Sequence, residues 1–579
     1  KLQCIIPHIV DGVNILLYFV LRTFFDTRRC IMGKYPCIIH SHSTTWHDGC
    51  VAILLENGEI YAIAAERVGN REKHSWNSKL AYDHLKNYLP KKLCTGDENN
   101  FLINPGADYL DTARHHLNHA AATFFASPFD RAAIHVVDGQ GPEDSKTTST
   151  TLWVGEGDEI QIVENHYPTK EKFASQSIGH FYTAVGVYAG ARHLYEEGKT
   201  MALAAYGKPS RFLEYLRQFV VSNPDGSYYI DGKLIEAILG NTLGPQLFGW
   251  SPSTGEIQEI WNKLLSLRSS SFRGLGDSIT SDDMDIAYAG QAILEEILLG
   301  LVRRLKELTG EKNLCLAGGV FLNCVANAAI VQSKVFDNVY IFPATGDDGQ
   351  AIGKLFLDIH SRKLSVSTRV ENAFLGPLYS TEDILKAIRN NKDILIVSDN
   401  LQKTVSMTAQ RLAAGELIGW FRGRSEIGPR ALGHRSILAD PRRREMRDFI
   451  NSYVKCREWY QPFAAMVLEE EAHNYFLLDS PSPFMLIAAK VKEDKAKIIP
   501  AVVHVDGSTR IQTVNRIQEE VLYDLLTCFS NITGIPMLLN TSFNRENEPI
   551  VEMPTDAIKT FMATQLNALV IENFLLVKK

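Results

Sequence analysis

Two histidines stand four residues apart, His115 and His119, in a segment whose apolar spacing predicts a helix. At that spacing both imidazoles lie on one helix face and can bind one metal ion together. Two carboxylates at the ends of predicted strands, Asp138 and Asp347, would complete a mixed nitrogen and oxygen site. Such a site suits Fe(II), Zn(II) or Mn(II). The alternative is that the histidines lie on the surface and the aspartates cap turns or helices. His116 lies about 100° round the helix and is left out.

Glycine-rich turns mark two further segments that could approach a phosphate. Lys199 lies in the sequence GKT at 198–200, but His193 stands where a P-loop requires glycine, so a Walker-type NTPase is excluded. A lysine that opens a helix can still meet a phosphate. The turn Gly318-Gly319, with Asn323 behind it, would let the backbone approach a nucleotide closely; a plain tight turn is the alternative.

Basic residues are concentrated between positions 422 and 457. They are Arg422, Arg424, Arg430, Arg435, Arg442, Arg443, Arg444, Arg447, Lys455 and Arg457. Arg430 and Arg435 lie among glycines, where a guanidinium group can bind an anion with two hydrogen bonds. Lys455 with Arg457 could bind a second anion, and Arg510 a third. The alternatives are a solvated charged surface and an RNA-binding site. Aromatic residues are sparse in this stretch and the net charge of the chain is negative, and both observations oppose RNA binding.

A late segment, LNTSFN at 539–544, places Ser542 and Asn544 between apolar residues after the strand-like sequence IPMLL. These side chains could hold a nucleotide or phosphate, and a polar turn explains them equally well.

The elements that must position these residues alternate between strands and helices. Strands are expected at 35–43, 50–66 with a hairpin turn at 56–58, 132–141, 314–317 and 338–344. Helices are expected at 78–88, 111–127, 285–308 and from about 323. The pattern predicts an α/β fold whose ligands lie at the carboxyl ends of strands. We expect an N-terminal extension at 1–34 and domains at 35–367 and 368–579.

Composition limits the class of protein. The 579 residues carry a net charge of −7, with 45% hydrophobic and 22% charged residues, which is typical of a folded globular protein. The charge predicts no nucleic-acid partner. Residues 15–25 are too short for a membrane span, and no signal peptide is recognised. Nine scattered cysteines without a C-x-x-C pair indicate free thiols in a reducing, cytoplasmic compartment.

Motifs along residues 36–578 resemble those of the nodulation-protein-U type O-carbamoyltransferases, which include the tobramycin and cephalosporin carbamoyltransferases. They are HDGCVAIL, HHLNHAAATFFAS, VVDGQG, GKTMALAAYG, LAGGVFLNCVAN, PATGDDGQAIG, FRGRSEIGPRALGHRSILADPR, VKCREWYQPFA, HVDGSTRIQTV and LNTSFNRENEPIV. Two positions depart from the family pattern: Asn547 replaces a usual glycine and Cys50 a usual serine.

The resemblance implies an N-terminal actin/sugar-kinase-like (TsaD-like) domain followed by a C-terminal YrdC-like α/β domain. It implies that carbamoyl phosphate and ATP form carbamoyl adenylate in the second domain. The carbamoyl group then passes to a substrate hydroxyl at a metal, iron in the family, in the first domain. Mg²⁺ would accompany ATP.

Residue by residue, the resemblance assigns His115, His119, Asp138 and Asp347 to the metal. It places Lys199, Gly318, Gly319 and Asn323 in nucleotide-facing segments. It places Arg430, Arg435, Lys455, Arg457, Arg510, Ser542 and Asn544 at the anion and ATP site, where Arg430, Lys455 and Arg457 are expected to act in catalysis. His47 would be a general base near the acceptor hydroxyl, or else a structural or substrate-orienting residue.

The hypothesis is therefore an ATP-dependent O-carbamoyltransferase that acts on a small natural product. The expected partners are that hydroxyl acceptor and a second copy of the chain in a homodimer, with no membrane and no nucleic acid. Two alternatives stay open: a tRNA threonylcarbamoyl-type transferase, and a catalytically silent binding protein on an actin-like fold.

Overall fold

The computed structural model describes residues 38–42, 48–55, 57–69, 71–75, 77–89, 114–143, 146–166, 176–243, 255–270, 272 and 278–579. The expected extension at 1–34 and the candidate base His47 lie outside the described residues. Across the described ranges, no helix is both long and apolar enough to cross a membrane.

The first sheet of the described chain has three antiparallel strands, β1 (Ile38–His42), β2 (Cys50–Leu54) and β3 (Ile60–Ala64). The predicted hairpin is confirmed: the Leu55 amide donates to the Glu59 carbonyl at 2.8 Å, and Gly58 has a φ of +91°. Helix α2 (Ser78–Tyr88) packs against β2 and β3, at the predicted place.

A second sheet, of five strands within the described residues, carries the centre of the N-terminal part. Its order is β10 (Asn338–Ile341), β9 (Asn313–Ala317), β4 (Arg131–Glu143), β5 (Lys146–Glu156) and β6 (Glu159–His166). The first three strands are parallel, so their carboxyl ends lie at one edge of the sheet. Helix α3 (His115–Ala126) packs on β4 and β9, and α12 (Gln350–Ser361) packs on α3, β1 and β2.

The predicted strand around Asp138 is longer than expected. Strand β4 continues to Glu143, and its pairing with β5 shifts register between Val137 and Gly141. The extra residues of such an irregularity are not paired in the ladder, which leaves their side chains free to turn toward a site. Asp138 therefore lies at a bulge inside a strand, where the sequence pattern predicts a strand end.

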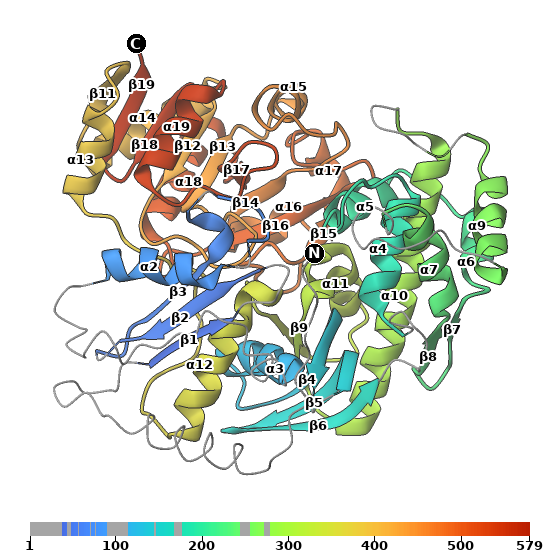
Figure 1. The fold of residues 1–579 in the computed structure, drawn as a ribbon. Helices are drawn as coiled ribbons and strands as arrows, with labels where there is room; N and C mark the ends of the chain where they lie inside the picture. Colours follow the sequence, from blue (N-terminus) through green and yellow to red (C-terminus); the bar gives the residue numbers. More distant parts are fainter. Residues whose placement is uncertain are drawn as a thin grey trace, which may run out of the picture.

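Helices gather on one side of the five-stranded sheet, at the right in Figure 1. Their bounds are Ile178–Tyr188 (α4), Glu197–Ala204 (α5), Arg211–Leu216 (α6), Gly232–Asn241 (α7), Glu256–Leu267 (α9) and Ser281–Thr309 (α10), with the short hairpin Val220–Ser222 (β7) and Tyr228–Ile230 (β8) between α6 and α7. Helix α10 begins four residues before the predicted start because Thr280 and Asp283 form a capping box.

The C-terminal part, orange to red in Figure 1, contains a mixed sheet of nine strands in the described chain. In sheet order they are β11 (Ile394–Ser398), β19 (Phe574–Lys578), β18 (Ala568–Ile571), β12 (Ile418–Phe421), β13 (Arg435–Ala439), β17 (Met537–Ser542), β14 (Ala464–Leu468), β16 (Ser508–Val514) and β15 (Ala488–Lys490). Helices α14 (Leu401–Ala413) and α18 (Glu520–Thr533) pack together, as do α13 (Thr381–Arg389) and α19 (Pro554–Ala563).

Two large apolar cores support this arrangement. One is built mainly from residues before Phe374, and the other from residues between Tyr379 and Leu576. The predicted α/β class is confirmed, and the domain boundary near residue 368 stays a prediction.

Candidate functional site

The four predicted metal ligands come together at the edge of the five-stranded sheet. The Nε2 atoms of His115 and His119 lie 3.0 and 3.2 Å from Oδ2 of Asp138. They lie 3.4 and 3.3 Å from Oδ1 of Asp347. One ligand atom from each residue falls within 4.8 Å of every other, in largely buried surroundings. The i, i+4 spacing on α3 therefore places both imidazoles as the sequence predicts.

Glycine amides orient the carboxylate of Asp138. Its Oδ1 atom accepts hydrogen bonds from Gly139 N at 2.8 Å and Gly319 N at 3.3 Å, which leaves Oδ2 to face the histidines. Gly318 has a φ of +98°, and a Cβ atom there would lie 2.1 Å from the Val137 carbonyl oxygen. Only glycine allows this close approach, so the Gly318-Gly319 turn supports a predicted metal ligand directly.

Two neighbours of the ligands have structural contacts. The Nδ1 atom of His116 lies 2.9 Å from the Thr151 hydroxyl, away from the cluster, as its position on the helix predicts. Cys50, one of the departures from the family pattern, is buried in β2, and its thiol donates to the Asp347 carbonyl at 3.4 Å. Cys50 therefore packs against the backbone of Asp347, one of the predicted metal ligands.

The charges in the cluster complement each other. Burial acts to lower the pKa of His119, but hydrogen bonds to Asp138 and Asp347 outweigh it and raise the pKa to about 9. Burial acts to raise the pKa of Asp138, but hydrogen bonds from the two histidines hold it well below its usual range. Two imidazole nitrogens and two carboxylates, converging and buried, are a donor set that fits one divalent ion and balances its charge.

A second cluster lies in the C-terminal part around Lys455. Its buried Nζ atom donates to Ser542 Oγ at 2.9 Å and to the Ser542 carbonyl at 2.7 Å, and it also contacts Asn544 Oδ1. Burial, together with the nearby charge of Arg457, holds the pKa of Lys455 well below its usual range. Strand β17 runs on to Ser542, so the predicted polar turn begins later than its sequence indicates.

Three arginines, Arg430, Arg457 and Arg510, extend this cluster of positive charge. Burial, together with the nearby charge of Arg510, lowers the pKa of Arg430 and of Arg457 to about 9. Within the described part of the chain, no carboxylate forms an ion pair with any of the three. The Nε atoms of Arg430 and Arg510 are buried, and neither has a hydrogen-bond partner among the residues that the structure describes. Such a concentration of guanidinium groups is typical of an anion site.

Arg435, the other arginine of this stretch predicted at the anion site, is bound into the fold. Arg435 is fully buried, and its guanidinium donates to the carbonyls of Arg422 and Gly423 at 2.8 and 3.1 Å. It also lies over the ring of Phe421 at 3.7 Å. The structure therefore does not bring the Arg435 side chain together with the arginine cluster.

The predicted nucleotide-facing residues of the N-terminal part have protein partners. Lys199 pairs with Glu196 at 2.7 Å and with Glu458 at 2.6 Å, which joins α5 to the residue after Arg457. Asn323 caps the helix Cys324–Gln332 (α11) and exchanges hydrogen bonds with Gln291.

One contact connects the two clusters. Arg430 Nη2 donates to the Leu322 carbonyl at 2.9 Å, in the segment that begins with Gly319, whose amide orients Asp138. The arginine cluster and the predicted metal ligands are therefore separated by a short stretch of chain.

A third group was not predicted from the sequence. Asp48, Glu66 and His74 offer ligand atoms within 4.8 Å of one another. His74 Nδ1 lies 3.0 Å from Asp48 Oδ1, and its ring stacks on Tyr195 at 4.3 Å. Asp48 and His74 come from separate loops and Glu66 from the 3₁₀ turn Ala65–Arg67. Only the position of Asp48 in the HDG motif could have indicated a functional role.

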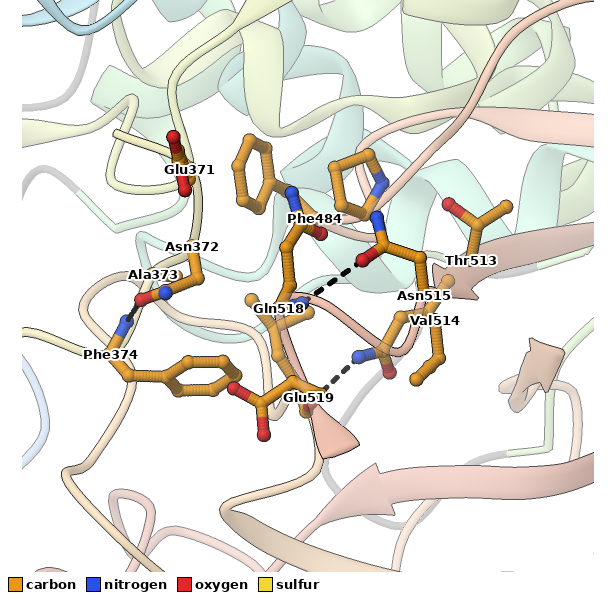
Figure 2. Close-up of a pocket in the computed structure, with 13 residues that line it drawn as sticks. Glu371, Asn372, Ala373, Phe374, Phe484, Thr513, Val514, Asn515, Gln518 and Glu519 are labelled. Carbon is orange, nitrogen blue, oxygen red and sulfur yellow. Dashed lines mark hydrogen bonds between the residues drawn. The ribbon is translucent and has the colours of Figure 1, made fainter. Parts of the chain in front are cut away.

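Figure 2 shows a narrow crevice between residues 371–374 and residues 512–519. Phe374 lines it and stacks on His434, which lies 2.8 Å from the carboxylate of Glu519. None of the predicted site residues lines this crevice.

Comparison with known families gives the class of protein. The model described as "Carbamoyltransferase N-terminus" matches residues 105–355, and "Carbamoyltransferase C-terminus" matches residues 409–578. The chain belongs to the carbamoyltransferase family and is an enzyme, which confirms the resemblance found in the sequence motifs.

Individual relatives agree with this assignment. Nodulation protein NolNO of Sinorhizobium fredii is 33% identical over 93% of this chain and 81% of its own length. Nodulation protein NolO of Bradyrhizobium diazoefficiens is 36% identical over 80% of this chain and 79% of its length. Among solved structures, HypF of T. kodakarensis covers 57% of this chain and 49% of its own, at 14% identity and a TM-score of 0.29. That likeness is too low to support an inference about ligands.

Proposed function

We propose that this carbamoyltransferase is ATP-dependent and forms an O-carbamoyl product on a small hydroxylated natural product. Carbamoyl phosphate is hydrolysed to carbamate and phosphate, and a carbamate oxygen then attacks the α-phosphate of ATP. Pyrophosphate leaves and carbamoyl adenylate forms. The acceptor hydroxyl attacks the carbamoyl carbon, the C–O bond to AMP breaks, and the hydroxyl proton passes to a base.

The observation that carries the proposal is the arginine cluster of Arg430, Arg457 and Arg510. Three guanidinium groups that form no ion pair with a carboxylate of the described chain leave strong donors for phosphate oxygens, which is what a site for ATP and carbamoyl phosphate needs. Lys455, Ser542 and Asn544 adjoin them and would bind the same anions.

Adenylation has a clear chemical purpose. Carbamate is a poor electrophile, and AMP is a far better leaving group than oxide. Carbamoyl adenylate would hydrolyse if released into water, so the second site must receive it within the protein. The link through Leu322 between the two clusters supports such a short path.

The N-terminal cluster is the proposed site of transfer. His115, His119, Asp138 and Asp347 would hold a divalent ion, with iron as the first candidate before zinc or manganese. When bound, such an ion supplies Lewis-acid polarisation of phosphate or carbonyl oxygens. His47 is the proposed base for the acceptor hydroxyl, since imidazole titrates near neutrality.

The test is release of pyrophosphate from ATP with and without carbamoyl phosphate, and with no acceptor. Wild-type protein should release pyrophosphate only when carbamoyl phosphate is present. Arg430→Ala should lower the rate by about a hundredfold, as expected when a preorganised donor is removed. Arg516→Ala is the matched control because Arg516 is 57% exposed and should leave the rate unchanged.

No release under any condition would refute the adenylating step. A thermal-shift comparison of carbamoyl phosphate, ATP and bulk tRNA would then decide between the tRNA-modifying and silent-binding alternatives, because each predicts a different stabilising ligand.

A further inference from the structure

A widened helical turn precedes Lys455. Residues Ile450–Val454 form a π-helical turn, in which the amide of Lys455 donates to the Ile450 carbonyl at 2.8 Å. Such turns insert one extra residue into a helix and are frequent at functional sites. The turn contains Asn451, whose side chain is almost completely buried at 1% exposure.

Asn451 makes contacts that converge on Arg457. Its side-chain Oδ1 accepts a hydrogen bond from Arg457 Nε at 2.8 Å, and its backbone carbonyl accepts one from the Arg457 amide at 3.0 Å. Its Nδ2 donates to the Gln461 carbonyl at 3.0 Å. The side chain of Asn451 therefore bonds both ends of the segment 457–461, one of which is Arg457.

These contacts determine which edge of the Arg457 guanidinium is available. Nε is taken by Asn451, Nη2 donates to the Pro462 carbonyl at 3.2 Å, and the group lies over the Phe463 ring at 4.7 Å. Among the described residues, Nη1 has no hydrogen-bond partner. The guanidinium is thus held through Nε, Nη2 and one face. Its Nη1 donors stay available for a ligand.

We propose that Asn451 is a positioning residue that orients Arg457 so that its Nη1 donors meet the anion bound in the arginine cluster. The proposal rests on the proposed function in one respect, that this cluster binds phosphate-bearing substrates. A neutral amide suits the role because a carboxylate would accept the same hydrogen bond but would cancel the charge that binds the anion.

The experiment is calorimetric titration of the full chain with inorganic pyrophosphate and with carbamoyl phosphate, alongside thermal melting. Asn451→Ala should weaken the binding of both anions by about tenfold or more, because a hydrogen bond to a charged group is lost. The matched control is Thr404→Val. Thr404 is fully buried and donates to the Asn573 carbonyl at 2.7 Å, next to β19, which at least four strands of the sheet separate from β14 and β16. It should lower the melting temperature without weakening anion binding.

Asn451→Asp is the second variant and keeps the test decisive if the alanine variant does not fold. This variant retains an acceptor for Arg457 Nε. Its affinity for pyrophosphate should nevertheless be lower than that of the wild type, because the carboxylate cancels positive charge, even if the two melting temperatures are equal. Wild-type affinity in a folded Asn451 variant would overturn the proposal, as would equal losses of affinity in Asn451→Ala and Thr404→Val.

The outcome of the binding experiment can be distinguished from the outcome of the test of the proposed function. Anion binding that depends on Asn451, in a protein without carbamoyl-phosphate-dependent pyrophosphate release, would support the positioning role and refute the reaction. Absence of anion binding by the wild type would overturn the positioning role. The proposed reaction would then be tested independently by the assay of pyrophosphate release.

Discussion

His135 should make the N-terminal part sensitive to acid. It lies on β4 with no exposed surface, and neither of its ring nitrogens has a partner in the part of the chain described. Its ring meets that of Phe321 edge to face at 5.3 Å. Burial, with a smaller effect of His166, lowers the pKa of His135 from 6.5 to about 3.

The sign of the effect follows from linkage. Between pH 6.5 and about 3 the unfolded chain protonates His135 while the folded chain keeps it neutral. The unfolded state therefore binds more protons, and stability falls as the pH falls. At pH 4.5, two units below the unfolded pKa, the cost is about 3 kcal/mol at ~1.4 kcal/mol per unit. At pH 8 this cost is absent.

The assay compares urea unfolding of the wild type and His135→Leu at pH 8 and pH 4.5. The variant should lose about 3 kcal/mol less free energy of unfolding between the two pH values, since leucine cannot be protonated. Other buried histidines titrate in both proteins, so their contributions cancel in the difference. An equal loss in both proteins would refute the reasoning and show that His135 is protonated or hydrated in the folded state.

Three further predictions concern the metal ligands and the core. Asp138→Asn should abolish stoichiometric divalent-metal binding, measured by metal analysis after dialysis, and full retention of the metal would remove Asp138 from the site. Gly318→Ala should destabilise the fold by about 1–2 kcal/mol or more, since alanine disfavours a positive φ and its Cβ would clash with the Val137 carbonyl; an unchanged melting temperature would contradict this. Arg268→Ala should cost about 3–5 kcal/mol in denaturant unfolding because it leaves the buried carboxylate of Asp283 without its ion-pair partner, and a loss below about 1 kcal/mol would show that the pair contributes little.

Local periodicity predicts much of the fold and part of the site. Helix α3 places His115 and His119 on one face because 3.6 residues per turn bring positions i and i+4 together. Parallel strands β4, β9 and β10 share one edge, which brings Asp138 and Asp347 to the same place. The left-handed φ of +60° at Asn547 likewise agrees with a position where the family usually has glycine.

Tertiary structure alone decides which of the many basic residues meet. Arg430 and Arg435 stand five residues apart in similar glycine-rich sequence, yet one lies in the arginine cluster and the other bonds backbone carbonyls in the core. Sequence spacing specifies neighbours within one helix or strand, whereas the direction of a loop side chain depends on long-range packing. The same reason hides the group around His74 and the contact between Asn451 and Arg457. His74 and Arg457 lie in irregular segments, where side chains have no period from which their neighbours can be inferred.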